Sequence, residues 1–500
     1  MKLFIENKDH KSLFPLFGII LITFFLSIPL LPFWIDLGHD KQVYLYGGMS
    51  IYKGNFPYVN FFDHKPPLIY VFVSIIWPLK HWGVFILQGI IKVIAAREIF
   101  FAASRLNIKQ PLLFSCIFLV LLLCPFILGA GLLTREFTAC FIAMSLTIVL
   151  GKGKYKYFFA GIFAGLIFHT QQEEVLIILP SLCYLIFLDL LHKRGGDLFN
   201  EILKRSGFIF CGFALVTLPL LIWIISHNAL TAYWQQTFLF NILVYGDNDT
   251  WQMKVDKIIS VLFHTRYLFF IVPVIFCHLY FMYKNKERKL NAMLLATWIT
   301  AIITKTFLGG ITNSNMPYHY LLSYSTLVTI SIMIIIRNIN IYYFPFRVPF
   351  LPGIILIFLL MWKNSFSRIY NLGQNNKDFS LLLKKFENIR NHDGQLYVMG
   401  NASFLALNNE LNILAPTKWI YQNHLNNQRI VFDPKNHVLY DILTGLEKNK
   451  TLYVIDFYRK KSADQLEFRK KWIAYIEKNY NEEENKENYI IYKRKPLDNQ

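Results

Sequence analysis

The most constraining feature of this chain is a series of long apolar runs separated by short polar segments. A helix needs about 20 mostly apolar residues to cross the hydrocarbon core of a bilayer. Runs near this length, some of them shorter, lie at 13–34, 84–104, 111–132, 137–150, 157–170, 175–191, 206–226, 259–282, 290–308, 318–336 and 348–362. The pattern predicts an α-helical polytopic membrane protein with about 11 transmembrane helices.

The composition agrees with a membrane protein and argues against a nucleic-acid partner. Of the 500 residues, 54% are hydrophobic and 17% are aromatic, which is too apolar for an ordinary soluble protein. The formal net charge is +19, but the Lys and Arg residues form short clusters between apolar runs. A nucleic-acid-binding protein would gather them on one basic face, so this distribution favours a lipid surface.

The basic residues also predict an orientation, because loops rich in Lys and Arg stay in the cytoplasm. Lys2, Lys8 and Lys11 precede the first run. With that end inside, the inner loops before residue 363 hold 18 basic residues and the outer loops hold 7. We therefore expect the N-terminus inside and the C-terminus outside, in the plasma (inner) membrane.

The segment 67–79 is apolar but is not counted as a span. Its 13 residues are too few to cross a bilayer, and prolines bound both ends. Such a segment more often lies along the interface. The first periplasmic loop then covers 35–83, a length that usually indicates function.

Residues 363–500 are polar and predict a soluble α/β domain on the outer face. Alternating segments at 395–400 and 451–458 are typical of strands, and 463–480 has helical spacing. The segment 488–495 resembles a closing strand. Residues 1–362 would form the transmembrane domain.

All six cysteines fall within the predicted spans, and none is arranged as CxxC. Disulfides and a thiolate metal site are therefore disfavoured. The sequence also contains no GxGxxG, GxxxxGK[ST] or HExxH motif, so neither nucleotide cradling nor zincin chemistry is supported.

Titratable residues gather in the first outer loop, at WIDLGHDKQVYLYGGMSIYKGNFPYVNFFDHKPPLIY. Asp40 precedes an apolar and aromatic pattern at 43–52 that suits a short helix on the membrane surface. Gly54, Pro57 and Tyr58 predict a turn before Asp63-His64-Lys65. Interfacial segments would thus hold two acidic sites about twenty residues apart.

The order of Asp40, Tyr44, Gly-x-x-Pro-Tyr and Asp-His-Lys-Pro-Pro-Leu resembles the first periplasmic loop of GT-C glycosyltransferases. The likeness is to family 39-like bacterial enzymes, which are related to protein O-mannosyltransferases and to the transferase that adds aminoarabinose to lipid A. Such enzymes use polyprenyl-phosphate sugars as donors and a lipid, glycan or protein as acceptor. The resemblance covers most of the chain and is most specific over 40–68.

The resemblance implies roles that suit sugar transfer, in which an acceptor hydroxyl must lose its proton and a departing phosphate must be stabilised. Asp40 matches the catalytic aspartate, a general base, although Lys41 stands where many relatives have Glu. Asp63 and His64 match an element that in some members binds a divalent metal ion, and Lys65 matches a phosphate-facing Lys. Tyr44 would support the acceptor side. Inversion at the anomeric carbon is also implied.

Other outer segments could complete such a site. Arg135 and Glu136 resemble an Arg/acid pair that opens the next helix in relatives, and a planar guanidinium suits a phosphate. His264 and Arg266 could bind metal or phosphate, respectively. In NSNMPYHYLL, Tyr318 and His319 resemble a recurrent cluster that meets the lipid-linked phosphate or sugar.

Each of these residues has a plainer interpretation. Asp40 could only cap a helix, Asp63 could only pair with Lys65, and Arg135 with Glu136 could anchor the interface. His264 could be satisfied by backbone, and His319 could belong to an aromatic belt.

Two other functions are compatible with a chain of this kind. A lipid-linked-sugar flippase would place charges inside its spans, as at Lys92, Arg97, Glu98 and Lys305, and would show an internal repeat, which is not evident. A non-catalytic envelope polysaccharide assembly protein would tolerate loss of the Asp40 carboxylate.

Overall fold

The computed structural model describes most of the predicted helices and the C-terminal sheet. It describes residues 13–32, 39–123, 134–151, 153, 155–187, 196–245, 250, 252, 271–307, 318–339, 379–420, 437–457 and 466–496. Contacts divide the chain into two compact units. One is formed from Met1–Leu31, Phe85–Trp223 and Tyr245–Arg368, and the other from Pro32–Val84, Ile224–Val244 and Ile369–Gln500.

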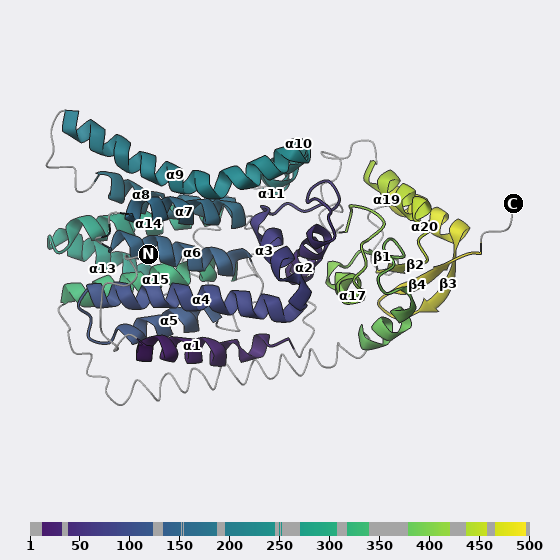
Figure 1. Cartoon of the computed structure of the whole chain (residues 1–500), viewed down its shortest axis with the longest axis horizontal. Helices are drawn as coiled ribbons and strands as arrows, with labels where there is room; N and C mark the ends of the chain where they lie inside the picture. Colours follow the sequence, from purple (N-terminus) through teal and green to yellow (C-terminus); the bar gives the residue numbers. More distant parts are fainter. Residues whose placement is uncertain are drawn as a thin grey trace. The chain divides into compact units, whose positions relative to one another are not determined.

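The first unit is a bundle of helices that run side by side (Figure 1). Its helices are α1 (Leu13–Ser27), α5 (Pro111–Leu123), α6 (Thr134–Val149), α7 (Lys156–Thr170), α8 (Val175–Phe187), α13 (Ile271–Tyr283), α14 (Arg288–Phe307) and α15 (Tyr318–Ile339). It also contains most of α4 (Lys80–Arg105) and α9 (Gly196–Ser226), which continue into the second unit. Each predicted span except 348–362 contains a described helix, and 348–362 lies outside the described residues.

Length and composition single out α9 among the described helices. Its stretch Asp197–Ser226, 30 residues long, is apolar enough to cross a bilayer by itself. Apolar helices of 10–17 residues occur at Phe14–Ser27, Pro111–Leu123, Ile271–Tyr283 and Tyr324–Ile339. The described helices thus support a membrane protein, while the count of about 11 spans remains a prediction.

The second unit joins the first outer loop to the C-terminal residues. The loop contributes α2 (His39–Tyr52), α3 (Leu68–Ile76) and a short 3₁₀ turn at Trp77–Leu79. At nine residues, α3 is too short to cross a bilayer. Residues after α9 add α10 (Leu230–Trp234), a π-helical turn (Gln235–Leu239) and α11 (Phe240–Tyr245).

The C-terminal part of this unit is a small α/β module around a four-stranded sheet. Its strands β1 (Leu396–Met399), β2 (Tyr453–Asp456), β3 (Tyr480–Asn485) and β4 (Ile490–Arg494) lie in the order β1-β2-β4-β3. The β1–β2 pair is parallel, with Leu396 opposite Tyr453, and the other two pairs are antiparallel. The predicted α/β module, with strands in 395–400, 451–458 and 488–495, is confirmed.

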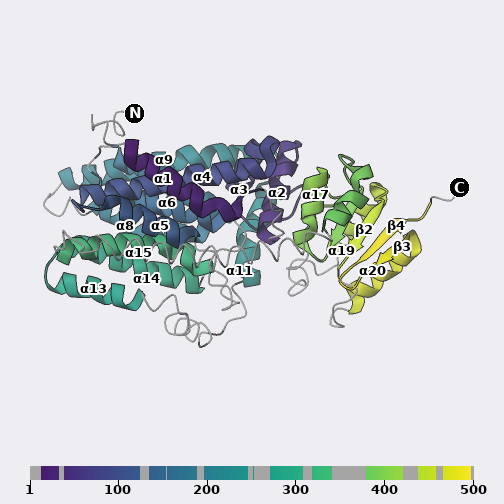
Figure 2. The ribbon, with the colours of Figure 1, turned by 90° about the horizontal axis from the view of Figure 1, so that it is seen from below.

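Both faces of the sheet are covered because alternate strand residues point to opposite sides. Tyr397 and Val454 pack on one face with α19 (His437–Lys448) and α20 (Leu466–Asn479), seen in Figure 2. Leu396 and Ile455 pack on the other face with α17 (Leu405–Leu411) and residues 379–389.

Candidate functional site

The loop 35–83 carries Asp40 in the first turn of α2. A helix N-terminus carries unpaired backbone N–H groups and a partial positive charge, which stabilise a carboxylate there. The side chain is half-buried. One helical turn later Tyr44 is buried, with its ring 6.1 Å from that of Tyr70 on α3.

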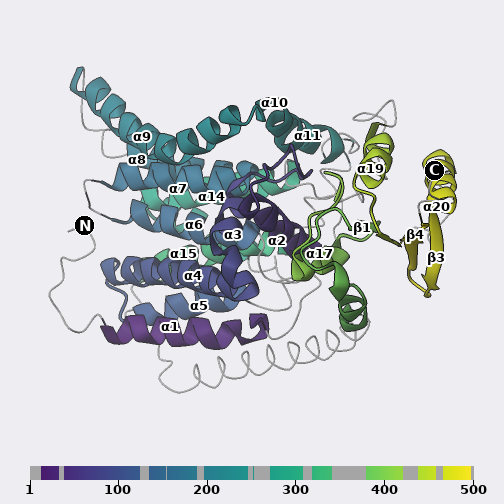
Figure 3. The ribbon, with the colours of Figure 1, turned by 45° about the vertical axis from the view of Figure 1, so that its right-hand side comes forward.

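Two glycines on α2 let α3 approach closely (Figure 3). A Cβ atom at Gly47 would collide with the Tyr70 ring and touch Phe61, and one at Gly48 would collide with Val73. Because both positions lack side chains, the Tyr70 ring can lie against α2. Its hydroxyl then reaches the Asp63 carboxylate.

The turn between α2 and α3 is held by Tyr58, whose φ of 70° is unusual for a non-glycine residue. Its backbone N–H donates to the Phe61 carbonyl at 2.9 Å, and its hydroxyl donates to the Lys65 carbonyl at 2.9 Å. From the π-helical turn, Gln236 donates to the Tyr58 carbonyl at 2.7 Å. These bonds fix the backbone on both sides of Asp63 and His64.

Asp63 is an ionised carboxylate held by short hydrogen bonds. Its Oδ1 accepts from the His64 backbone N–H at 2.6 Å, and its Oδ2 accepts from the Tyr70 hydroxyl at 2.5 Å. Burial alone would raise the pKa of Asp63, but the bonds from His64 and Tyr70 and the charge of Lys65 lower it to about 2. Asp63 is therefore a weak base.

His64 is buried beside Asp63. Burial lowers the pKa of its imidazole and the Lys65 charge lowers it further, whereas Asp63 and Asp40 act in the opposite direction. Its ring stacks on Phe240 at 5.6 Å, and Asn241 donates to its carbonyl at 3.0 Å. Asp63, His64 and Tyr70 thus form one buried polar cluster.

Arg135 and Glu136 lie in the first unit, at the start of α6. Both side chains are buried. Glu136 accepts a hydrogen bond from Gln88 on α4 at 2.6 Å and lies 3.8 Å from the Lys92 amino group. Glu136 is thus part of a buried polar group among apolar helices.

A second buried pair in this unit joins Lys305 on α14 to Glu174, just before α8. The charges at Lys92 and Lys305, noted from sequence as features of a transporter, are both paired with acids. Isolated ions are costly to bury in an apolar interior, and pairing lowers that cost.

The remaining predicted residues lie at or beyond the limits of the described chain. Tyr318 and His319 form the start of α15. His264 and Arg266 lie outside the described residues. Over the part that the structure describes, no three His, Cys, Asp or Glu side chains are arranged to hold a metal ion.

Sequence reasoning passed over the tyrosines that organise the loop. Tyr70 ends the very stretch that contains Asp63, and its spacing of seven residues gave no signal that it would fold back. Tyr58 was recognised only as part of a turn. The contact between Glu136 and Lys92 joins residues 44 positions apart, which no local pattern can reveal.

Similar solved structures share the fold across nearly the whole chain. ArnT from Cupriavidus metallidurans bound to undecaprenyl phosphate is 11% identical with a TM-score of 0.57, covering 96% of this chain and 97% of that one. Its apo form is 12% identical with a TM-score of 0.53 and the same coverage. AglB from Archaeoglobus fulgidus, an oligosaccharyltransferase in complex with an inhibitory peptide and a dolichol-phosphate, is 12% identical with a TM-score of 0.45, covering 90% and 70%.

No protein-family model matches the sequence, and no curated protein matches it either. The resemblance to GT-C enzymes is nevertheless confirmed at the level of the fold, because the two ArnT structures match over almost their entire length.

Proposed function

We propose that this protein is a membrane glycosyltransferase that moves a sugar from a polyprenyl-phosphate donor to an acceptor hydroxyl. The observation that carries the proposal is the buried cluster of Asp63, His64 and Tyr70, in the same loop as Asp40 and in a chain with the GT-C fold. The ArnT structure of the same fold was solved with undecaprenyl phosphate, which supports a lipid-phosphate donor. The acceptor is a lipid, a glycan or a protein.

Asp40 is the general base in this proposal. Asp63 is unsuited to the role, because both of its oxygens accept hydrogen bonds and its pKa of about 2 makes it a poor proton acceptor. Asp40 is half-buried in the first turn of α2, and we place the acceptor hydroxyl beside it. Asp63 instead fixes the position of His64 and Tyr70.

The departing phosphate needs positive charge. We assign that role to Lys65, which follows His64, and to Arg135, Arg266 and His319, with Tyr44, Glu136 and Tyr318 supporting the acceptor side. Guanidinium groups suit phosphate because their paired donors match its oxygens. The transfer would invert the anomeric carbon, as a single displacement does.

A divalent metal ion would be held by Asp63 and His64, with His264 as a third ligand. The described residues supply only the first two donors, and the Asp63 oxygens already accept two hydrogen bonds. A bound ion would add positive charge near the phosphate. In the proposed mechanism, deprotonation of the acceptor and stabilisation of the departing phosphate rely on side chains of this chain alone.

The proposed topology has about 11 spans, with the N-terminus inside the plasma (inner) membrane and residues 35–83 and 363–500 on the periplasmic side. Residues 1–362 would form the catalytic membrane domain. The excess of basic residues in alternate loops supports this orientation.

The test is sugar transfer by Asp40→Asn in membranes supplied with radiolabelled polyprenyl-phosphate sugars and endogenous acceptors. We expect transfer to fall at least about a hundredfold, since general-base catalysis contributes on that order. Asp197→Asn is the matched control, because Asp197 also lies in the first turn of a helix, α9, and is exposed.

Loss of transfer in Asp40→Asn with full activity in Asp197→Asn supports Asp40 as the general base. It also excludes a role for Asp40 that is limited to capping α2. Equal activity of wild type and Asp40→Asn, at equal abundance, would show that Asp40 is not the base.

A further inference from the structure

A cavity of about 540 Å³ lies within the second unit, away from the Asp63 cluster. One wall comes from α2 and the turn after it, through Tyr46, Ser50 and Asn55. The other wall comes from residues 414–418 of the C-terminal module and from α19. The volume falls within the range of roughly 300–1,000 Å³ that is typical of small-ligand sites.

The lining is unusually polar for a ligand site, since most such sites are largely apolar. The walls carry hydroxyl, amide, carboxylate and ammonium groups beside apolar surface. The charges of the lining side chains balance, with carboxylates at Asp393 and Asp441 and ammonium groups at Lys418 and Lys448. Asp393 also pairs with Lys53 at 2.7 Å, and Asp441 lies 3.7 Å from Lys418. A cavity of this kind suits a neutral ligand with many hydroxyl groups.

Some lining groups are available to such a ligand. Within the described residues, the side chains of Asn55, which is half-buried, and Thr444, which is exposed, make no hydrogen bond to the protein. They come from both walls of the cavity. A hydroxyl-rich ligand between them could both donate to and accept from these groups.

The cavity wall is built to a fixed shape. Gly394 has a φ of +79°, and a Cβ there would collide with the Asn449 side chain. A Cβ at Gly445 would collide with the Pro416 carbonyl oxygen. The Asn449 amide donates to the carbonyls of Gly445 at 2.8 Å and Pro416 at 3.1 Å, which ties α19 to the loop beneath it.

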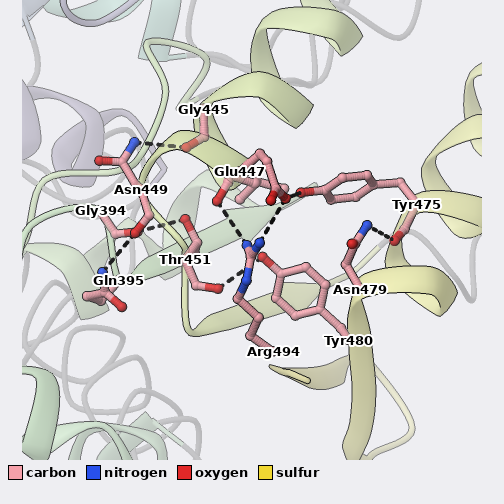
Figure 4. A network of polar contacts seen from close by, with 11 residues as sticks. Gly394, Gln395, Gly445, Glu447, Asn449, Thr451, Tyr475, Asn479, Tyr480 and Arg494 are labelled. Carbon is pink, nitrogen blue, oxygen red and sulfur yellow. Dashed lines mark hydrogen bonds and ion pairs between the residues drawn. The ribbon is translucent and has the colours of Figure 1, made fainter. Parts of the chain in front are cut away.

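A network of polar contacts connects this wall to the sheet (Figure 4). Thr451 donates to the Gly394 carbonyl at 2.8 Å, and its own carbonyl accepts from the Tyr480 hydroxyl at 3.0 Å. Arg494 on β4 donates to Glu447 on α19 at 2.8 Å. The wall is therefore fixed before any ligand arrives, which favours binding.

The cavity also has a defined relation to Asp40, because both lie on α2. Tyr46 is six residues beyond Asp40 in the helix. At 1.5 Å per residue Tyr46 is about 9 Å and Ser50 about 15 Å further along the helix axis, and both are turned by roughly 80–120° around the helix from Asp40. These distances suit sugar units that neighbour a reacting hydroxyl rather than the reacting group itself.

We propose that this cavity binds a neutral sugar residue of the acceptor, adjacent to the one that receives the transferred sugar. The inference rests on the proposed function and names its acceptor class: a glycan, free or attached to a lipid. Binding energy from this remote residue would orient the reacting hydroxyl toward Asp40.

The test is saturation-transfer difference NMR on the full chain, purified in a detergent without a sugar headgroup. The probes are methyl glucoside, methyl galactoside, methyl mannoside and N-acetylglucosamine. Thr444→Trp would fill the cavity, and Asn55→Ala would remove one amide from the opposite wall. Tyr440→Trp is the control, because it adds an indole to an exposed position of the same helix.

We expect at least one sugar to give a signal that weakens at least tenfold in Thr444→Trp, weakens less in Asn55→Ala and persists in Tyr440→Trp. Signals insensitive to Thr444→Trp, or no signal from any of the sugars, would overturn the proposal. The result for Thr444→Trp counts only if this variant unfolds at the same thermal midpoint as wild type. If it does not, the weaker signal expected for Asn55→Ala decides the test.

The Asp40→Asn variant separates this proposal from the proposed function. It should bind the sugar as wild type does while losing transfer. If wild type binds the sugar but transfers none, the cavity still binds a sugar, and the proposed glycosyltransferase function is overturned. In wild type that does transfer, the bound sugar should compete with the acceptor and not with the donor.

Discussion

At the scale of single residues, the hydrogen bonds to Asp63 make this carboxylate a poor candidate for the base. The loop carries two acids, Asp40 and Asp63, and the resemblance already points to Asp40. The bond from Tyr70 and the neighbouring backbone N–H stabilise the charged form of Asp63 and remove it as a proton acceptor. In the proposed mechanism the base is therefore Asp40.

Tyr70→Phe tests this difference through stability against pH. Loss of a hydrogen bond to a charged group should destabilise the protein by about 2 kcal/mol near neutral pH. A depressed carboxyl pKa stabilises the fold above the unfolded value of 3.8, and that contribution is lost as the pH falls toward about 2. The gap in thermal midpoint between wild type and Tyr70→Phe should therefore be constant above about pH 4 and narrow below it.

Tyr52→Phe is the control for this measurement, because it removes a hydroxyl from an exposed tyrosine on α2. The thermal midpoint of Tyr52→Phe should equal that of wild type at every pH. A gap for Tyr70→Phe that stays constant down to about pH 3 would mean that Asp63 is not the group that the hydroxyl stabilises.

At the scale of elements, close packing of α2 against α3 brings the parts of the cluster together. Gly47→Ala adds a methyl group where the Tyr70 ring lies, so we expect a loss of about 1–3 kcal/mol of stability. Transfer should fall as well, because the Tyr70 ring and its hydroxyl move.

Gly89→Ala is the control: Gly89 is a helical glycine of α4 with open space around it, and alanine there should be neutral or stabilising.

Thermal midpoints and transfer rates of the two variants provide the measurement. If Gly47→Ala matched Gly89→Ala in both, the close approach of α3 would have no role in the site.

The elements also show what the sequence can predict. Apolar runs and alternating strands have local periods, so the helices and the strands β1, β2 and β4 were predictable. Strand β3 was missed because its sequence, YNEEEN, is an exposed edge whose charged residues hide the strand pattern. The loop motif pointed to Asp40, Asp63 and His64, but the bond between Tyr70 and Asp63 depends on α3 packing on Gly47, a tertiary contact.

At the scale of the second unit, side chains far apart in sequence join the first outer loop to the C-terminal module. Asn409 on α17 donates to both the backbone carbonyl and the side-chain oxygen of Gln42, at 3.0 and 2.8 Å. The Phe62 N–H donates to the Lys418 carbonyl at 2.8 Å, and the Tyr46 hydroxyl accepts from the Ala415 N–H at 2.8 Å. The module thus buttresses the helix that carries Asp40.

A double-mutant cycle on Gln42 and Asn409 tests this support. Both side chains are buried, so Gln42→Leu or Asn409→Leu alone should cost about 1–3 kcal/mol by removing the buried hydrogen bond between them. The double variant should lose less than the two together, with a coupling of about 0.5–1.5 kcal/mol, because that hydrogen bond can be lost only once.

Urea midpoints give the stabilities, and transfer rates should follow them, since each single change loosens α2 at Asp40. Additive losses would mean that the two residues act independently and that the module does not hold the loop through this contact. Asn412→Leu should show no coupling with Gln42→Leu, because the Asn412 side-chain amide donates to Asn391 within the module and only its backbone carbonyl contacts the loop, through Lys53.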